Sequence, residues 1–224
     1  MKIYYHPIST TSRPLMMFAA DNNLDIEFQV IDLFTGEHVQ PPYLAKNPSG
    51  LVPMLEDGDF RLTESSAILK YLADKISSPA YPKDLRQRAR VNERMDWLNT
   101  QFYRDFGYGL VYPQLFPHLK RPNEEQQKGV IAWGKEKAKG WLKVLDESVI
   151  GPKNDYLCGN ELTIADYFGA AFVTAGDTVR CNLSAYPNIT RWLNKMKARP
   201  NWAKVNKPYY DLAASLKEMQ FEAI

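Results

Sequence analysis

The sequence predicts an α/β domain built on a mixed four-stranded sheet, followed by an all-helical domain. Short alternating apolar segments, interrupted by one helical segment, fill the first part of the chain. A tight turn at Asp57-Gly58 joins two of these segments, which makes that strand pair antiparallel. From residue 85 onward the apolar residues recur at helical spacing, with little strand-like alternation.

The expected elements of the first part follow one another as strand, helix, strand, short helix, strand, strand and helix. The strands are expected at 2–5, 26–31, 52–56 and 60–62, and the helices at 13–20, at 43–46 and from Ala67 onward. A strand–helix–strand crossover makes its two strands parallel, so the sheet is mixed. This is a thioredoxin-like layout. Pro53 must lie at the start or edge of its strand, because it has no N–H to donate.

The pattern breaks at Ser77–Pro82, where serines and prolines replace apolar residues. We therefore expect an α/β domain over 1–77, a linker over 78–84 and a helical domain over 85–224. Within the helical part, Thr163 and Asp166 are spaced as the N-cap and third helical residue of a capping box, a structural role worth about 1 kcal/mol. The lysine-rich run at 135–143 is expected to be a solvated helix face.

The composition is that of a soluble globular protein. Of 224 residues, 45% are hydrophobic and 24% are charged, and the net charge of +2 argues against a nucleic-acid partner. No signal peptide or membrane-spanning run is visible, so a cytoplasmic location without membrane association is expected. The two cysteines, Cys158 and Cys181, form no CxxC motif, which excludes a zinc site and a dithiol redox site. Any thiol chemistry must therefore use a thiol that the substrate brings.

Residues 61–69, RLTESSAIL, indicate a binding site at the start of a helix. Free backbone N–H groups at such a start favour a ligand carboxylate, while Glu64 can hold a neighbouring ammonium. Together they fit the zwitterionic end of a small peptide. The alternative is that Thr63 only caps the helix, with Ser66 three residues on.

These motifs together resemble a cytosolic glutathione transferase of the serine type, over essentially the whole chain. The LTIAD box at 162–166 is part of this resemblance. The segments that most resemble the theta and delta classes and their bacterial relatives are DLFTGEH at 32–38, KNPSGLVPMLEDGDF at 46–60 and LTESSAILKYL at 62–72. The resemblance implies the glutathione S-transferase fold, glutathione as co-substrate without a metal, and a homodimer.

The resemblance also places Ser9 on the catalytic serine position of the family, in the segment HPISTTSR at 6–13. There its hydroxyl donates a hydrogen bond to the glutathione sulfur and favours the thiolate, which is the nucleophile. Thr10 is the next candidate, and Tyr4 and Tyr5 are expected to be packing residues. The alternative is a polar loop, Ser9 to Ser12, that merely caps the helix that follows.

Further residues match glutathione-binding positions of the family. Glu64 and Ser65 correspond to residues that hold the γ-glutamyl end, Val52 pairs through its backbone with the cysteinyl part, and Pro53 is the cis proline. His38 corresponds to a residue near the glycine carboxylate, although an exposed loop histidine is the alternative. Where relatives carry Lys, Gln or His around 50–51, this chain has Gly50-Leu51, so Lys46 or Arg104 becomes the substitute anchor or glutathione binds more weakly.

An unusually aromatic stretch, residues 102–113, falls where the family binds its second substrate. We expect Tyr103, Phe106 and Tyr112 in a hydrophobic pocket and Arg104 as a partner for a leaving anion, unless these rings belong to the core. The leading function is glutathione transfer to small hydrophobic electrophiles in detoxification, by substitution, conjugate addition or dehalogenation. The alternatives are glutathione-dependent peroxide reduction and a non-catalytic binding protein with the same fold.

Overall fold

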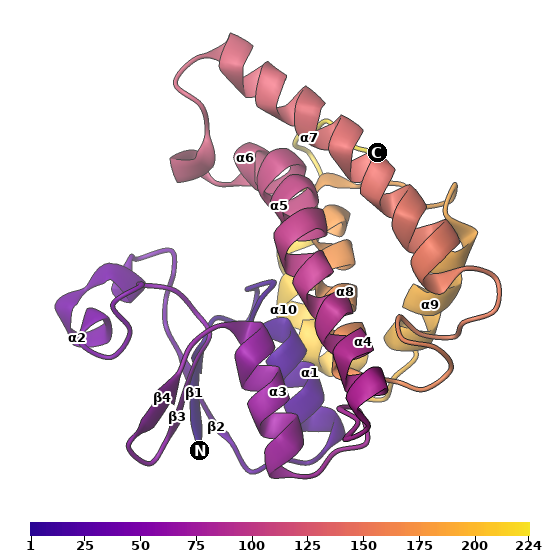
Figure 1. Ribbon diagram of the computed structural model, residues 1–224. Helices are drawn as coiled ribbons and strands as arrows, with labels where there is room; N and C mark the ends of the chain where they lie inside the picture. The colour runs from indigo at the N-terminus through magenta and orange to yellow at the C-terminus, as the bar shows by residue number, and fades with distance from the viewer.

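The computed structural model describes residues 1–224 and has a four-stranded sheet at one end and helices over the remainder (Figure 1). The strands are β1 (Lys2–Tyr5), β2 (Glu27–Val30), β3 (Met54–Asp57) and β4 (Phe60–Leu62), in the spatial order β2-β1-β3-β4. Strand β1 is parallel to β2 and antiparallel to β3, which is antiparallel to β4. The mixed four-stranded sheet of a thioredoxin-like domain is thus confirmed.

Helices α1 (Arg13–Asp21) and α3 (Ser65–Lys75) lie between the sheet and the helical domain, whereas η1 (Glu37–Val39) and α2 (Pro41–Leu44) lie at the outer end of the sheet (Figure 1). Helix α2 begins two residues before the expected segment, because a proline at the first helical position has the φ angle a helix start needs. Strand β3 begins after Pro53, which cannot donate to the ladder.

Helix α3 begins at Ser65 rather than at Ala67, so the sequence-based position of its start was wrong. Glu64 takes the N-cap place with φ 63° and ψ 112°, and no side chain caps the helix. The cap expected from Thr63 is therefore not formed. This leaves the first N–H groups of α3 without a side-chain partner.

Two long helical stretches dominate the helical domain. The first runs without a break through α4 (Leu85–Trp97), the π-helical η2 (Leu98–Phe102), α5 (Tyr103–Asp105), the π-helical η3 (Phe106–Val111) and α6 (Tyr112–Leu115), and the second is α7 (Glu124–Val144) (Figure 1). The two stretches touch at Gly109 and Gly134, where a Cβ added to Gly134 would overlap the backbone of Gly109. Glycine is therefore required at this crossing.

The remaining helical segments are η4 (Pro117–Leu119), η5 (Leu145–Ile150), α8 (Ile164–Val173), η6 (Thr174–Val179), α9 (Pro187–Lys197) and α10 (Trp202–Ser215). All residues of α8 are buried, and the predicted capping box at its start is confirmed. The fully buried Asp166 carboxylate accepts hydrogen bonds from Leu157 N and Thr163 N, both at 2.8 Å, and from Trp192 Nε1 at 2.9 Å. Burial raises the pKa of Asp166 to about 6, against the lowering effect of these hydrogen bonds.

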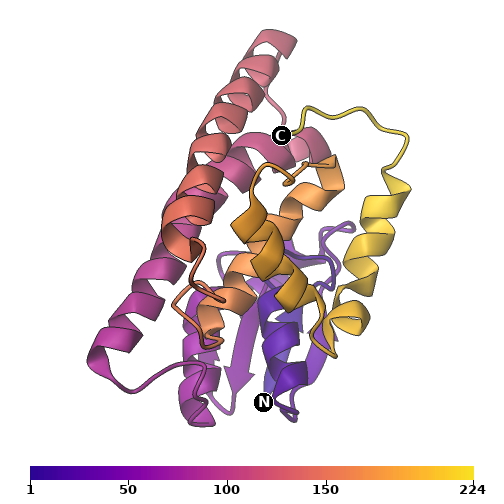
Figure 2. The same cartoon turned by 90° about the vertical axis from the view of Figure 1, so that its right-hand side faces the viewer.

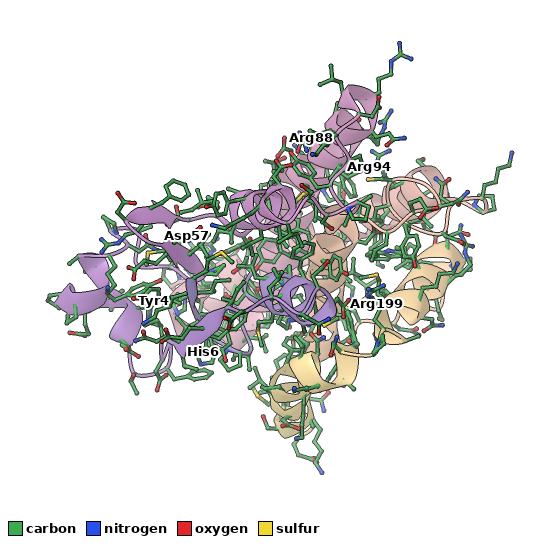
Figure 3. The ribbon with its side chains drawn as sticks, turned by 90° about the horizontal axis from the view of Figure 1, so that it is seen from below. Tyr4, His6, Asp57, Arg88, Arg94 and Arg199 are labelled. Carbon is green, nitrogen blue, oxygen red and sulfur yellow. The ribbon has the colours of Figure 1, made fainter.

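The two parts of the chain are joined by charged contacts at their border. Arg88 of α4 donates to the Pro82 carbonyl at 2.7 Å and pairs with Asp74 of α3 at 2.6 Å. Arg199, seen in Figure 3 beside α1, pairs with the carboxylate of Asp21 at 2.5 Å. These contacts tie α1 and α3 to the helical domain and so fix the space between the two parts.

After α10 the chain crosses the helical domain as an extended segment that ends near α6 and α7 (Figure 2). Gln114 of α6 exchanges two hydrogen bonds with the backbone of Glu222, at 2.8 and 2.9 Å, and Lys135 pairs with the Glu222 carboxylate at 3.1 Å. Even the longest helix, α7 with 21 residues, lacks the apolar stretch that a membrane span requires.

Candidate functional site

A cavity of about 1040 Å³ lies between the N-terminal part and the helical domain. It brings together nearly all the residues that the sequence singled out: Ser9, His38, Val52, Pro53, Glu64, Ser65, Tyr103, Arg104 and Tyr112. The N-terminal loops supply its polar side, and its apolar side comes from these loops, from residues 103–119 and from η6 and α10 with the residue that follows it. The cavity is therefore large enough and varied enough to hold a small peptide beside an apolar molecule.

Phe106 is the exception, because the structure does not bring it to the cavity. Its side chain is fully buried and stacks on Phe102, with 4.9 Å between the ring centroids. Tyr103 of α5 lines the cavity, whereas Phe106, the first residue of the π-helical η3, faces the core. Phe106 is therefore a core residue, as the alternative interpretation of the aromatic stretch had it.

The loop after β1 presents Ser9 at the cavity. His6, labelled in Figure 3 at the end of β1, starts this loop, and its carbonyl accepts from Ser9 N at 3.0 Å. The Ser9 carbonyl in turn accepts from Ser12 N and Arg13 N, both at 3.0 Å, at the first turn of α1. The half-buried Ser9 hydroxyl accepts from Ser12 N at 3.3 Å and lies 3.0 Å from Thr11 Oγ1.

Arg13 anchors this loop to the helical domain. Its fully buried guanidinium donates to Ala171 O at 2.7 Å and to Asn206 Oδ1 at 3.0 Å, and lies 3.7 Å from the centroid of the Tyr209 ring. No carboxylate pairs with it. The neighbourhood of the hydroxyl loop therefore holds a positive charge in addition to the N-terminus of α1, and both favour an anion there.

The start of α3 forms the second polar corner of the cavity. Glu64 is held at φ 63°, a backbone conformation that costs a non-glycine residue about 1–3 kcal/mol. Ser65 is buried, and the first N–H groups of α3 have no side-chain cap. A ligand carboxylate can accept from these N–H groups, while the exposed Glu64 carboxylate can accept from an ammonium. The corner thus matches both charges of an amino-acid end.

The third corner is built by residues 38–53. The Val52–Pro53 peptide bond is cis, in agreement with the expectation from the resemblance. Thr11 Oγ1 donates to the Val52 carbonyl at 3.1 Å, and Tyr43 and Asn47 both donate to the Leu51 carbonyl at 2.7 Å. This segment therefore presents its backbone in a fixed position.

The side chains at this corner hold little positive charge. His38 is half-buried at the cavity, and its Nδ1 atom has no hydrogen-bond partner. The Leu51 side chain is 59% exposed and cannot bind a carboxylate. Of the two substitute anchors, Lys46 does not line the cavity and pairs with Glu56 at 3.6 Å, whereas Arg104 does line it.

The opposite wall is aromatic and rigid. Tyr103 stacks on Phe172, with 4.0 Å between ring centroids and 17° between ring planes, and its hydroxyl is hydrogen-bonded to that of Tyr112. Tyr112 donates to Thr10 Oγ1 at 2.7 Å, which connects this wall to the loop of Ser9. Burial raises the pKa of both tyrosines, that of Tyr112 to about 12.

Arg104 stands beside this wall with a fixed direction. Its guanidinium makes two hydrogen bonds to the fully buried Asp105 carboxylate, at 2.8 and 3.0 Å, and Trp141 Nε1 donates to the same carboxylate at 2.7 Å. The Arg104 side chain is 55% exposed. Part of its positive charge therefore remains available to an anion in the cavity.

Several lining residues were missed by the sequence reasoning. Helix α10 contributes Tyr209 and Leu212, its C-cap residue Leu216 follows on the same side, and η3 contributes the half-exposed Tyr108. The first three residues recur at spacings of three and four, which is a signal for one helix face. That signal shows a buried face but does not tell core from cavity.

Comparisons with known proteins agree with this architecture. The family description "Glutathione S-transferase, N-terminal domain" matches residues 1–74, and "Glutathione S-transferase, C-terminal domain" matches residues 113–200. The fold and the cavity thus define a thioredoxin-like domain paired with a helical domain around one shared site. The chain belongs to the glutathione S-transferase family.

Among its relatives, human glutathione S-transferase theta-2 is 35% identical over 203 residues, which are 88% of this chain and 81% of that protein. A delta-class glutathione transferase from Nilaparvata lugens has a TM-score of 0.80 at 31% identity, covering 98% of this chain and 99% of that chain. Human glutathione-S-transferase T1-1, a mutant in its apo form, has a TM-score of 0.82 at 25% identity, covering 98% and 91%. The theta-like character of the sequence is thereby confirmed.

Proposed function

We propose that this protein is a glutathione transferase that ionises the thiol of glutathione beside Ser9 and transfers the thiolate to small hydrophobic electrophiles. The observation that carries the proposal is the single cavity that joins the Ser9 hydroxyl and the start of α3 to the wall of Tyr103 and Tyr112. A thiol placed between them would face a hydrogen-bond donor on one side and an apolar molecule on the other.

In the proposed binding mode, the γ-glutamyl carboxylate accepts from the free N–H groups at Ser65, and the ammonium lies against Glu64. The backbone of Val52 pairs with the cysteinyl part, next to Pro53. The glycine carboxylate extends toward His38, where Leu51 offers no charge. This arrangement places the sulfur at the Ser9 loop.

In the proposed mechanism, the Ser9 hydroxyl donates a hydrogen bond to the sulfur and lowers the thiol pKa from its usual value of about 8.5. A shift of two units requires about 2.7 kcal/mol, which one charge-assisted hydrogen bond and the α1 N-terminus together can supply. The thiol proton passes to water. In the addition to an enone, the S–C bond forms, the π electrons move to the carbonyl oxygen, and water returns a proton to the resulting enolate. In substitution, the thiolate attacks the electrophilic carbon, the S–C bond forms, and a leaving group departs with its electron pair. Arg104 is placed to accept that anion.

The proposal also includes assembly as a homodimer, a cytoplasmic location, and the division into domains 1–77 and 85–224 with the linker 78–84. The linker falls between α3, which ends at Lys75, and α4, which begins at Leu85. Light scattering measures the mass in solution, and a monomeric mass at micromolar concentration would contradict the proposed dimer.

The activity is tested by steady-state turnover of glutathione with an aryl halide, an enone, a haloalkane and an organic hydroperoxide. We expect conjugation with at least one of the first three compounds. If only the hydroperoxide is turned over, the activity is glutathione-dependent peroxide reduction and not glutathione transfer. Binding of glutathione without any turnover would indicate a protein that only binds it.

A further inference from the structure

The hydroxyl groups around the cavity form two chains of hydrogen bonds. One chain ends at the backbone carbonyl of Val52, and the other ends at the hydroxyl of Thr10. A hydroxyl has one proton to donate, so the direction of each chain can be followed from its donors. Thr11 donates to the Val52 carbonyl at 3.1 Å, which leaves Ser9 as the donor in its 3.0 Å contact with Thr11. In this arrangement the Ser9 proton is already engaged within the loop.

The second chain runs from the aromatic wall toward the loop. Tyr112 donates its proton to Thr10 Oγ1 at 2.7 Å, so in the contact between the two tyrosine hydroxyls Tyr103 is the donor. The chain thus runs from Tyr103 to Tyr112 to Thr10. Thr10 accepts within it. Its hydroxyl also lies close enough to Tyr103 to lower the pKa of that tyrosine against the effect of burial, but it donates no hydrogen bond to a protein acceptor, and the residue lines the cavity and is only 5% exposed.

We infer that Thr10 is a second catalytic residue, whose hydroxyl donates to the glutathione sulfur together with Ser9, and that Tyr112 and Tyr103 are positioning residues that hold this proton toward the cavity. The inference rests on the proposed function. In this arrangement the sulfur accepts hydrogen bonds from the adjacent hydroxyls of Ser9 and Thr10. The Ser9 hydroxyl must first turn away from Thr11, whereas the Thr10 hydroxyl can donate without such a rearrangement.

The packing around the chain keeps its direction fixed. Tyr103 lies flat on Phe172, and a Cβ at position 107 would overlap its ring, so Gly107 leaves the space that the ring fills. Because burial raises the pKa of Tyr103 and Tyr112 far above neutrality, both tyrosines keep their protons over the working pH range. Hydrogen bonds donated in sequence polarise one another, which makes the last hydroxyl a better donor.

The test is the pH titration of enzyme-bound glutathione, followed by the ultraviolet absorbance of its thiolate. We expect Thr10→Val, which keeps the shape and removes the hydroxyl, to raise the bound thiol pKa by about one unit, the weaker end of what a hydrogen bond to a charged group contributes. Thr10→Ser should restore the wild-type value, and Tyr112→Phe should cause a smaller rise. Thr190→Val, on the exposed surface of α9, is the matched control and should titrate like the wild type.

The outcomes separate the inference from the function on which it rests. If the wild type forms a thiolate that Ser9→Ala weakens while Thr10→Val titrates like the wild type, the inference is overturned and the proposed function stands. If Thr10→Val lowers turnover of an enone without moving the thiol pKa, Thr10 serves the electrophile and the sulfur assignment is again overturned. If the wild type binds glutathione and forms no thiolate, the function and the inference both fail.

Discussion

Replacing Leu51 by lysine should strengthen glutathione binding, because it places a cation where the proposed binding mode puts the glycine carboxylate. The Leu51 side chain is 59% exposed at the cavity edge, so the new ion pair would be largely solvated. Exposed pairs contribute about 0.2–1 kcal/mol, which corresponds to a dissociation constant lower by a factor of about 1.4 to 5. The turnover number should not change, because the carboxylate is remote from the sulfur.

Calorimetric titration of glutathione at low and high salt measures this effect. Salt screens exposed charges, so the gain should shrink at high ionic strength. Leu85→Lys is the matched control: it adds the same charge at the first residue of α4, where the side chain is 82% exposed and outside the cavity. If the affinity for glutathione rises equally in both variants, or does not rise in Leu51→Lys, the reasoning is refuted. The glycine carboxylate would then bind in another part of the cavity.

Two further predictions concern stability. Asp166→Asn replaces an acceptor by a donor that faces buried N–H groups, and should lower the free energy of unfolding by about 2–3 kcal/mol in urea denaturation. The folded-state pKa of Asp166, about 6, lies above the ordinary value of 3.8. The stabilising contribution of Asp166 is therefore complete below pH 3.8 and declines as the pH rises toward 6. The difference in free energy of unfolding between the wild type and Asp166→Asn should thus become smaller from about pH 4 to about pH 6, and a larger difference at about pH 6 would contradict this reasoning. Arg13→Met leaves Ala171 O and Asn206 Oδ1 buried without their donor and should lower the free energy of unfolding by about 2–4 kcal/mol. A decrease below about 0.5 kcal/mol would show that burying the Arg13 charge costs about as much as its hydrogen bonds stabilise.

The sequence was sufficient for part of the sheet because the signals of that part are local. The turn at Asp57-Gly58 indicates the antiparallel pair of β3 and β4, and the crossover indicates that β1 and β2 are parallel. The antiparallel pairing of β1 with β3 joins distant segments and was not predicted. The start of α3 was misplaced for a similar reason. Glu64 has a left-handed φ that its residue type does not favour, and only the surrounding structure imposes it.

The candidate site could be predicted on its polar side and only in part on its apolar side. Motifs place Ser9, Glu64 and Ser65 through short stretches of sequence, whereas the aromatic wall depends on how far each helix turns. Phe106 and Tyr103 are three residues apart, yet one lies in the core and the other lines the cavity. The hydrogen bond from Tyr112 to Thr10 joins residues 102 positions apart, and no local sequence pattern predicts it.

We propose that the Ser9 hydroxyl stabilises the thiolate of bound glutathione. The most direct measurement is the thiolate absorbance of bound glutathione against pH, in the wild type and in Ser9→Ala. If Ser9 acts in this way, the thiol pKa should lie about two units below 8.5 in the wild type and should rise by about one unit or more in the variant. A thiolate that forms at the same low pH in both proteins would contradict the assignment of Ser9.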